Sequence, residues 1–199
     1  MCKHEEKTLS HTYLGNKSNI FKNNSIRSTA GAAFIYGVNF LDTTANTSYW
    51  ENNNITGGAG GVLIQSNNNY FNMTNITATG AGGNVTENLG DNNTFREGYV
   101  NKGTGTNAVI LNSSAGTINF INVTNFVTQK SSVRVVGGTL RVFWYVDANV
   151  TNALDASGIS GAAFTMANDT EFPPLLFQRT TNSSGGIGTP FLEVREFLQ

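Results

Sequence analysis

Cysteine and histidine are scarce in this chain, and each scarcity excludes a class of protein. Cys2 is the only cysteine among 199 residues, so neither a disulfide framework nor a cysteine-based metal site can form within one chain. The two histidines, His4 and His11, lie in a polar N-terminal segment, where a polar tail is favoured over metal ligation. Because no histidine follows, a Ser-His-Asp triad is excluded from the rest of the chain, and we predict neither a metal site nor a cofactor.

Charge and long apolar runs are scarce as well. Charged residues make up 13% of the chain and the net charge is −1, which gives no field that favours nucleic acid or an anionic membrane. No run approaches the roughly 18 apolar residues of a membrane helix, so we expect no membrane span. Residues 1–15 also lack the apolar segment of a signal peptide. The chain is therefore expected to be intracellular, or a fragment or mature form of a longer protein.

The chain is rich instead in a repeated unit of about two dozen residues. A large apolar anchor is followed five residues later by an aliphatic residue, as with Trp50 and Ile55, and then by a Gly- or Asn-rich corner. The anchors are residues 21, 50, 71, 95 and 118, with spacings of 29, 21, 24 and 23. Short apolar segments close the units at residues 34–36, 62–64, 84–86, 108–111 and 133–135.

These segments indicate strands, because they are β-branched and aromatic and show no sustained helical period. Leucine-rich repeats share the period, but the chain lacks leucine at fixed spacing. One unit cannot bury its own apolar face, whereas stacked units can. The repeat therefore predicts a solenoid in which each coil adds about 4.8 Å along the axis.

The repeat resembles that of the right-handed parallel β-helix family, which includes pectate-lyase-like proteins and many microbial surface proteins. The matching stretches are NNSI, NNNIT, NMTNIT and FINVTNF, with the corners TGGAGG and TGAGG. The resemblance implies an all-β fold, with a right-handed parallel β-helix of about five coils over residues 18–138. Residues 1–17 would form a polar lead-in or an N-terminal cap. The handedness comes from the resemblance alone.

The pattern changes after Gly138. Residues 140–146 alternate as a strand with Leu140, Val142 and Trp144 on one face, and turns at 157–158 and 181–186 separate later strands at 159–166 and 187–197. This order resembles a carboxypeptidase-regulatory-like or immunoglobulin-like β-sandwich over residues 139–199. The segment is short for a sandwich of about 100 residues, so it is either incomplete or continues and caps the solenoid. Asn182 replaces the family's Asp, which argues against a metal role for its turn.

Asparagine is unusually abundant, and its context allows two interpretations. Of 28 asparagines, thirteen begin an Asn-x-Ser/Thr sequence, against about five expected by chance. Such sequences are N-glycosylation acceptors in exported proteins. Alternatively, the strand period places Asn and Thr two apart on the outer face whenever the residue between them points inward, and stacked asparagines can form ladders. This alternation applies to residues 54–56, 75–77 and 122–124.

The glycosylation hypothesis names specific residues. Three of them, Asn149, Asn168 and Asn182, lie beyond the repeat, where the strand period does not explain them. The predicted sites are Asn54, Asn75, Asn122, Asn149, Asn168 and Asn182.

Acidic residues would be needed by an enzyme on this scaffold. β-Helix glycosidases and lyases use paired carboxylates, or carboxylate-bound calcium with a basic residue. Glu87, Asp91 and Glu97 are close in sequence and are expected near one corner, next to Arg96. If the chain is an enzyme, Glu87, Asp91 and Arg96 are the catalytic candidates, although isolated charges on a polar loop explain them equally well.

The remaining motifs point to structure or to binding. The Gly-rich stretches 57–61 and 80–83 lack the following Lys-Ser/Thr of a phosphate loop and are expected to be corners. Both tryptophans are expected in the core. Tyr70 and Tyr99 are expected outside it, and together with Asn54 and Asn75 they are the candidate binding residues.

The favoured hypothesis is a non-catalytic structural or adhesive module of an extracellular or cell-surface protein, which presents a polar face to glycans or surface proteins. The alternative is a polysaccharide lyase or glycoside hydrolase on the same scaffold. A third hypothesis, a phage or viral fibre segment, requires outward apolar stripes, for which Phe143 and Tyr145 are the candidates.

Overall fold

The computed structural model describes residues 19–28, 36–40, 47–58, 60–79, 84–101, 107–124, 133–167, 176–188 and 191–198. Within these ranges the chain forms strands and no helix. It divides into two units, Met1–Val142 with Arg195–Gln199 and Phe143–Val194. The predicted all-β class is therefore confirmed.

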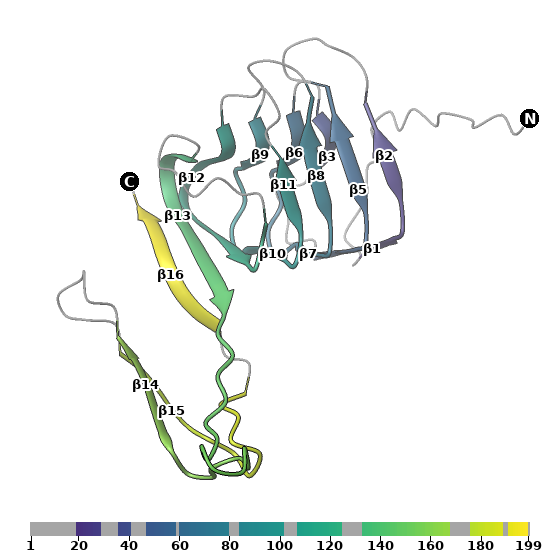
Figure 1. Ribbon diagram of the computed structural model, residues 1–199. Coiled ribbons are helices and arrows are strands. Elements are labelled where there is room, and N and C mark those ends of the chain that lie inside the picture. The colour runs from purple at the N-terminus through teal and green to yellow at the C-terminus, as the bar shows by residue number, and fades with distance from the viewer. Residues whose placement is uncertain are drawn as a thin grey trace, which may run out of the picture. The chain divides into compact units, whose positions relative to one another are not determined.

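Successive repeats of the first unit place strands at three recurring positions (Figure 1). The first position holds β1 (Asn19–Lys22), β4 (Ser48–Glu51), β7 (Tyr70–Asn72) and β10 (Asn93–Arg96). The second holds β2 (Ser25–Arg27), β5 (Asn54–Gly57), β8 (Asn75–Ala78) and β11 (Tyr99–Asn101). The third holds β3 (Tyr36–Phe40), β6 (Gly60–Ile64) and β9 (Asn84–Asn88).

The strands at each position pair in parallel with their counterparts in the neighbouring repeats. The long strand β12 (Asn107–Ile121) pairs with β9 through its first part and with β10 through its last part. It thereby joins the first and third positions into one sheet, while β11-β8-β5-β2 form a separate four-stranded sheet. This parallel stacking is consistent with a β-solenoid.

An aromatic stack forms the interior of the first position. Phe21, Trp50, Phe71, Phe95 and Phe120 are successive register partners. Their ring centroids lie 4.1, 6.0, 4.3 and 5.1 Å apart in that order. All except Phe21 are buried, so the aromatic anchors of the repeat form a continuous core, and the prediction that Trp50 is a core residue is confirmed.

The fifth anchor was misplaced by sequence reasoning. Phe95 pairs with Phe120, and Ile118 pairs with Asn93, so the spacing is 25 residues rather than 23. Both Ile118 and Phe120 are buried because they alternate inward on one strand. Spacing alone could not decide between two inward residues.

The third strands are also shifted from their expected places. Val62 pairs with Val38 in one direction and with Thr86 in the other, so the strands equivalent to 62–64 lie at 38–40 and 86–88. The expected residues 34 and 35 lie outside the described residues. The polar residues Thr86 and Asn88 hid the correct alignment, because both are buried at positions that are apolar in the preceding repeat.

Buried asparagines line one corner of the stack. Asn93 Oδ1 accepts from the backbone N–H and the side-chain amide of Asn69, at 2.8 and 2.9 Å. The Asn93 amide donates to the Ser66 carbonyl oxygen and to Asn88 Oδ1, at 3.0 and 2.7 Å. Burial of amides requires such pairing, so this network stabilises the fold rather than offering groups to a ligand.

A left-handed residue marks the corner between the first and second positions in each repeat. These residues stand one position after the first strand and have φ angles between 47° and 57°. They are Asn23, Asn52, Met73, Glu97 and Asn122. Asparagine tolerates this conformation better than other residues with side chains, which explains part of the asparagine content.

The Gly-rich corner after β5 requires close backbone approach. A Cβ atom on Gly57 would lie 1.5 Å from the Gly60 carbonyl oxygen. Gly57 therefore serves the tight corner that the sequence indicated.

The strand β13 (Val133–Tyr145) is continuous, whereas the sequence predicted two strands separated at Gly137-Gly138. Leu140 and Val142 are buried and Arg141 is exposed, as the alternation predicted. Trp144 is only half-buried, so its expected core position is wrong. The strand β16 (Phe191–Leu198) pairs with β13, which itself pairs with β12.

The second unit contains an antiparallel pair, β14 (Ala163–Ala167) and β15 (Leu176–Thr180). The predicted turn at 181–186 is present: Asn182 Oδ1 accepts from the N–H groups of Ser184 and Gly186, each at 3.0 Å. The β-sandwich itself stays a prediction.

Candidate binding faces

The outer side of the sheet β11-β8-β5-β2 carries two polar rows, which we call the Asn/Thr face. The face exists because Ile55, Ile76 and Val100 point inward and are buried, so both neighbours of each point outward. One row contains Ser25, Asn54, Asn75 and Tyr99, and the other contains Arg27, Thr56, Thr77 and Asn101.

At the centre of the Asn/Thr face, the side chains of Asn54, Thr56, Asn75 and Thr77 have no hydrogen-bond partner in the described part of the chain. Asn54 and Asn75 are exposed, and Thr56 and Thr77 are half-buried. The buried Asn53, next to Asn54 in sequence, is instead fully engaged: its Oδ1 accepts from Asn24 and its amide donates to the Phe21 carbonyl oxygen. Asn53 therefore has a structural role, whereas the side chains of Asn54 and Asn75 point outward.

The Asn/Thr face is nearly neutral. Arg27, on the first strand of the sheet, is the only charged residue of the two rows. The other members are amides, hydroxyls and one phenol, each of which can both donate and accept a hydrogen bond. The face is chemically suited to neutral ligands with hydroxyl groups.

The structure brings together three of the four predicted binding residues. Tyr99, Asn54 and Asn75 share one row of the Asn/Thr face. Tyr70 lies on the other sheet, where its ring is stacked on Tyr49 with centroids 5.4 Å apart and planes 5° apart. One side of the Tyr70 ring is therefore already covered by Tyr49.

The Tyr49 ring also neighbours an ion pair. Lys22 Nζ lies 2.5 Å from Glu51 Oε2 and 5.7 Å from the centroid of the Tyr49 ring. The hydrogen bond to Glu51, followed by its charge, raises the pKa of Lys22. Lys22 is exposed and Glu51 is half-buried, and the pair joins β1 to β4 across the sheet, which is a structural role.

The three catalytic candidates occupy different parts of the fold. Glu87 lies on β9 between the buried Thr86 and Asn88, and its register partners are Leu63 and Ile110. Arg96 lies on β10 and pairs with its neighbour Glu97 at 3.3 Å. Asp91 lies before β10, on the far side of the left-handed Asn92, whereas Arg96 is the last residue of that strand, whose four residues alone span roughly 10 Å. The structure does not bring Asp91 and Arg96 together.

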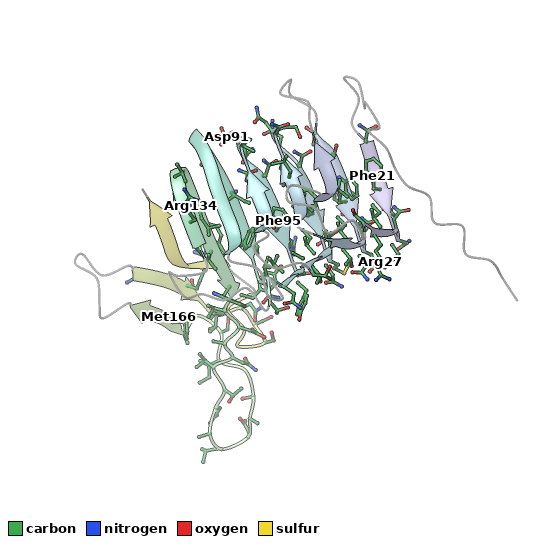
Figure 2. The ribbon with its side chains drawn as sticks, turned by 90° about the horizontal axis from the view of Figure 1, so that it is seen from above. Phe21, Arg27, Asp91, Phe95, Arg134 and Met166 are labelled. Atoms are coloured by element: carbon green, nitrogen blue, oxygen red, sulfur yellow. The ribbon has the colours of Figure 1, made fainter. Side chains whose placement is uncertain are left out.

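Asp91 has a structural role at its corner. Its Oδ1 accepts from the backbone N–H groups of Asn92 and Thr117, each at 2.7 Å. The Asp91 N–H in turn donates to Asn67 Oδ1, also at 2.7 Å. Asp91 therefore links three successive repeats, at a corner distant from Arg27 in Figure 2.

The predicted glycosylation sites differ in their surroundings. Asn54 and Asn75 are exposed and follow the strand alternation that the structural interpretation required. Asn122 does not, because it stands at the left-handed corner and is half-buried. The exposed residues Asn149 and Asn182 lie in the second unit, and Asn168 lies outside the described residues.

Sequence reasoning missed the inward asparagines Asn53, Asn69 and Asn93. The runs Asn52-Asn53-Asn54 and Asn67-Asn68-Asn69 were a usable signal, because each run spans a corner. Each run includes a left-handed residue and a buried one.

Within the described ranges, no group of three or more His, Cys, Asp or Glu side chains is placed to hold a metal ion. None of the described segments forms a helix with the length and apolar character that a membrane span requires. Comparison of the chain with protein-family models, with curated proteins and with solved structures gave no match.

Proposed function

We propose that the chain is a non-catalytic structural or adhesive module of a cell-surface or secreted protein, and that the Asn/Thr face binds a glycan or a protein. The proposed architecture is a right-handed, pectate-lyase-like β-helix of about five coils over residues 18–138. An immunoglobulin-like or carboxypeptidase-regulatory-like segment follows over residues 139–199. The parallel stacking and the repeated core rows support the helix, and the turn at Asn182 is compatible with the second segment.

A single observation carries the binding proposal: the repeat presents identical outward groups in neighbouring strands. Asn54 and Thr56 are the register partners of Asn75 and Thr77, and none of the four side chains is used within the described structure. A rigid parallel sheet holds these groups in place before a ligand arrives, which lowers the entropic cost of binding.

Export and N-glycosylation belong to the same proposal. The exposed sequons at Asn54, Asn75 and Asn149 support them. The structure adds a constraint, because Asn54 and Asn75 are adjacent register partners on the proposed binding face. A glycan on either residue would cover that face, so binding and glycosylation at these residues exclude each other.

The test is a glycan-array screen run beside a reducing-end release assay on mixed polysaccharides. Binding without release, weakened by Asn54→Ala/Asn75→Ala, is the expected result. Release of new reducing ends that is abolished by Glu87→Gln or Asp91→Asn would overturn the proposal in favour of a polysaccharide lyase or glycoside hydrolase. Asp91→Asn is preferred to alanine because its amide oxygen can still accept the hydrogen bonds from the backbone N–H groups of Asn92 and Thr117.

A further inference from the structure

We infer that the Asn/Thr face binds the flat, ordered surface of a neutral polysaccharide, across the strands, rather than a single soluble oligosaccharide. The inference rests on the proposed function and specifies its ligand class. It is carried by the chemistry, charge and periodicity of the two rows.

The chemistry of the face matches hydroxyl groups. The Asn54 and Asn75 amides and the Thr56 and Thr77 hydroxyls each include a donor and an acceptor. Sugar hydroxyls have the same dual character and can pair with any of these groups. The side chains of these four residues lack a hydrogen-bond partner in the described part of the chain, so binding to them breaks no internal hydrogen bond.

The charge of the face favours a neutral partner. Arg27 lies at the end of its row, on β2, and the central strands β5 and β8 contribute no charged residue to either row. An anionic polymer would need several cations along its path to form a salt-dependent complex. The central part of the face offers it none.

The periodicity of the face favours an ordered ligand. Equivalent groups recur at one strand spacing, about 4.8 Å, and the two rows lie two residues apart, about 6.6 Å. The rows cross all four strands of the sheet, so neighbouring sugars of an ordered surface can contact groups of neighbouring repeats.

The strength of each contact explains why order matters. One hydrogen bond that replaces water contributes little net affinity, so many must form together. A soluble oligosaccharide loses conformational freedom when it binds to a flat surface, whereas a chain fixed in a solid has already lost it. Binding that is shared among repeats therefore favours the solid polymer through multivalency.

The experiment compares binding of the full chain, made in a bacterial host that adds no N-glycans, to five probes. Microcrystalline cellulose and chitin are the neutral solids, their soluble hexasaccharides are the short ligands, and calcium polygalacturonate is the anionic solid. The test variant is Thr56→Val/Thr77→Val, which removes two hydroxyls and keeps β-branched residues on the strands. The control variant is Thr94→Val/Asn119→Ala, on the outer row of the other sheet.

The expected result is binding to a neutral solid that is at least about tenfold weaker in Thr56→Val/Thr77→Val and unchanged in the control, as two lost hydrogen bonds imply. Binding should hardly change between about 0.05 and 0.5 M salt. Equal affinity for the hexasaccharide, or a preference for polygalacturonate, overturns this inference but leaves an adhesive function in place. Binding that the Thr56→Val/Thr77→Val variant leaves unchanged overturns both this inference and the assignment of the face. Circular dichroism of both variants separates unfolding from lost contacts.

Discussion

The side-chain amide of Asn69 donates to Asn93 Oδ1 at 2.9 Å, and each residue, no more than 1% exposed, directly precedes one of the register partners Tyr70 and Thr94 of neighbouring repeats. The contact belongs to a buried chain that also includes Ser48, whose N–H donates to Asn69 Oδ1, and Asn88, which accepts from Asn93. Stacked repeats thus place identical amides where each satisfies the next. The amides thereby fix the register that apolar side chains alone leave free.

Asn93→Ala should strongly destabilise the first unit. The substitution removes four hydrogen bonds and leaves the backbone N–H of Asn69 and the Oδ1 of Asn88 buried without this partner, whereas the Asn69 side-chain amide still donates to Ser66. Each such group costs about 1–3 kcal/mol, so we expect a loss of roughly 3 kcal/mol or more in the free energy of unfolding. Urea denaturation measures it. The exposed Asn54→Ala is the control and should change stability by less than about 0.5 kcal/mol. Equal effects of the two variants would refute the structural role of the ladder.

Met73→Asn should stabilise the protein. Met73 has a φ of 47° at the left-handed corner, where three of the equivalent residues are asparagine. Two of these asparagines bond to each other: the Asn52 amide donates to Asn23 Oδ1 at 2.8 Å. Asparagine accepts this conformation at lower cost, so a gain of up to about 1 kcal/mol is expected in thermal or urea unfolding. Met73→Val is the opposite control, because a β-branched residue is strained at positive φ. A Met73→Asn variant no more stable than Met73→Val would contradict this reading of the corner.

The core rows could be predicted from the sequence because their signal is local. Trp50 and Ile55 are buried, as are Phe71 and Ile76 in the next repeat, and both residues of each pair were assigned inward. Alternation along short strands and a recurring anchor suffice for this assignment.

The corners could not be predicted, because alternation does not continue through a left-handed residue. In the run from Asn52 to Asn54, the first residue has positive φ, the second is buried and the third is exposed. Three identical residues thus have three roles, and only the hydrogen-bonding partners in neighbouring repeats distinguish them. The same limit affects the candidate site: the sequence offered Asp91 as a catalytic candidate or an isolated loop charge, whereas its carboxylate accepts from the N–H of Thr117 in the next repeat.

Asp91 should behave as a corner residue. Asp91→Ala removes the acceptor of two backbone N–H groups and should lower the free energy of unfolding by about 1–2 kcal/mol. Asp91→Asn retains an oxygen at that place and should cost distinctly less. Urea denaturation of the two variants side by side decides the matter. Equal destabilisation would mean that the negative charge, rather than the hydrogen bonds, holds the corner.

The turn of the second unit that contains Asp155 should depend on pH. The Ser157 hydroxyl and N–H donate to Asp155 Oδ1 at 2.7 and 3.0 Å, and these bonds, the hydroxyl's first, lower the pKa of Asp155. Because the folded-state pKa lies below the unfolded one, the stabilisation is present above the unfolded-state pKa. It is lost as the pH falls through the folded-state pKa.

An NMR titration of the Asp155 carboxyl carbon tests this account. Ser157→Ala should raise the pKa of Asp155 toward the ordinary value of about 3.9. Ser183→Ala, in another exposed turn of the same unit, should leave it unchanged. A pKa of Asp155 that does not respond to Ser157→Ala would show that the hydroxyl is not its main determinant.

Glycosylation at Asn54 should prevent binding by the Asn/Thr face. Asn54 neighbours Thr56 in its own strand and Asn75 in the next, so a glycan attached to its amide would stand over all four central groups. Protein from a glycosylating host can be separated by lectin chromatography, and peptide mapping by mass spectrometry then assigns occupancy at each asparagine. Forms occupied at Asn54 or Asn75 should lose binding to the neutral solid, whereas forms occupied only at Asn149, in the second unit, should keep it. Full binding by a form occupied at Asn54 would place the ligand on another surface, and the Tyr49–Tyr70 side of the first sheet would be the next one to test.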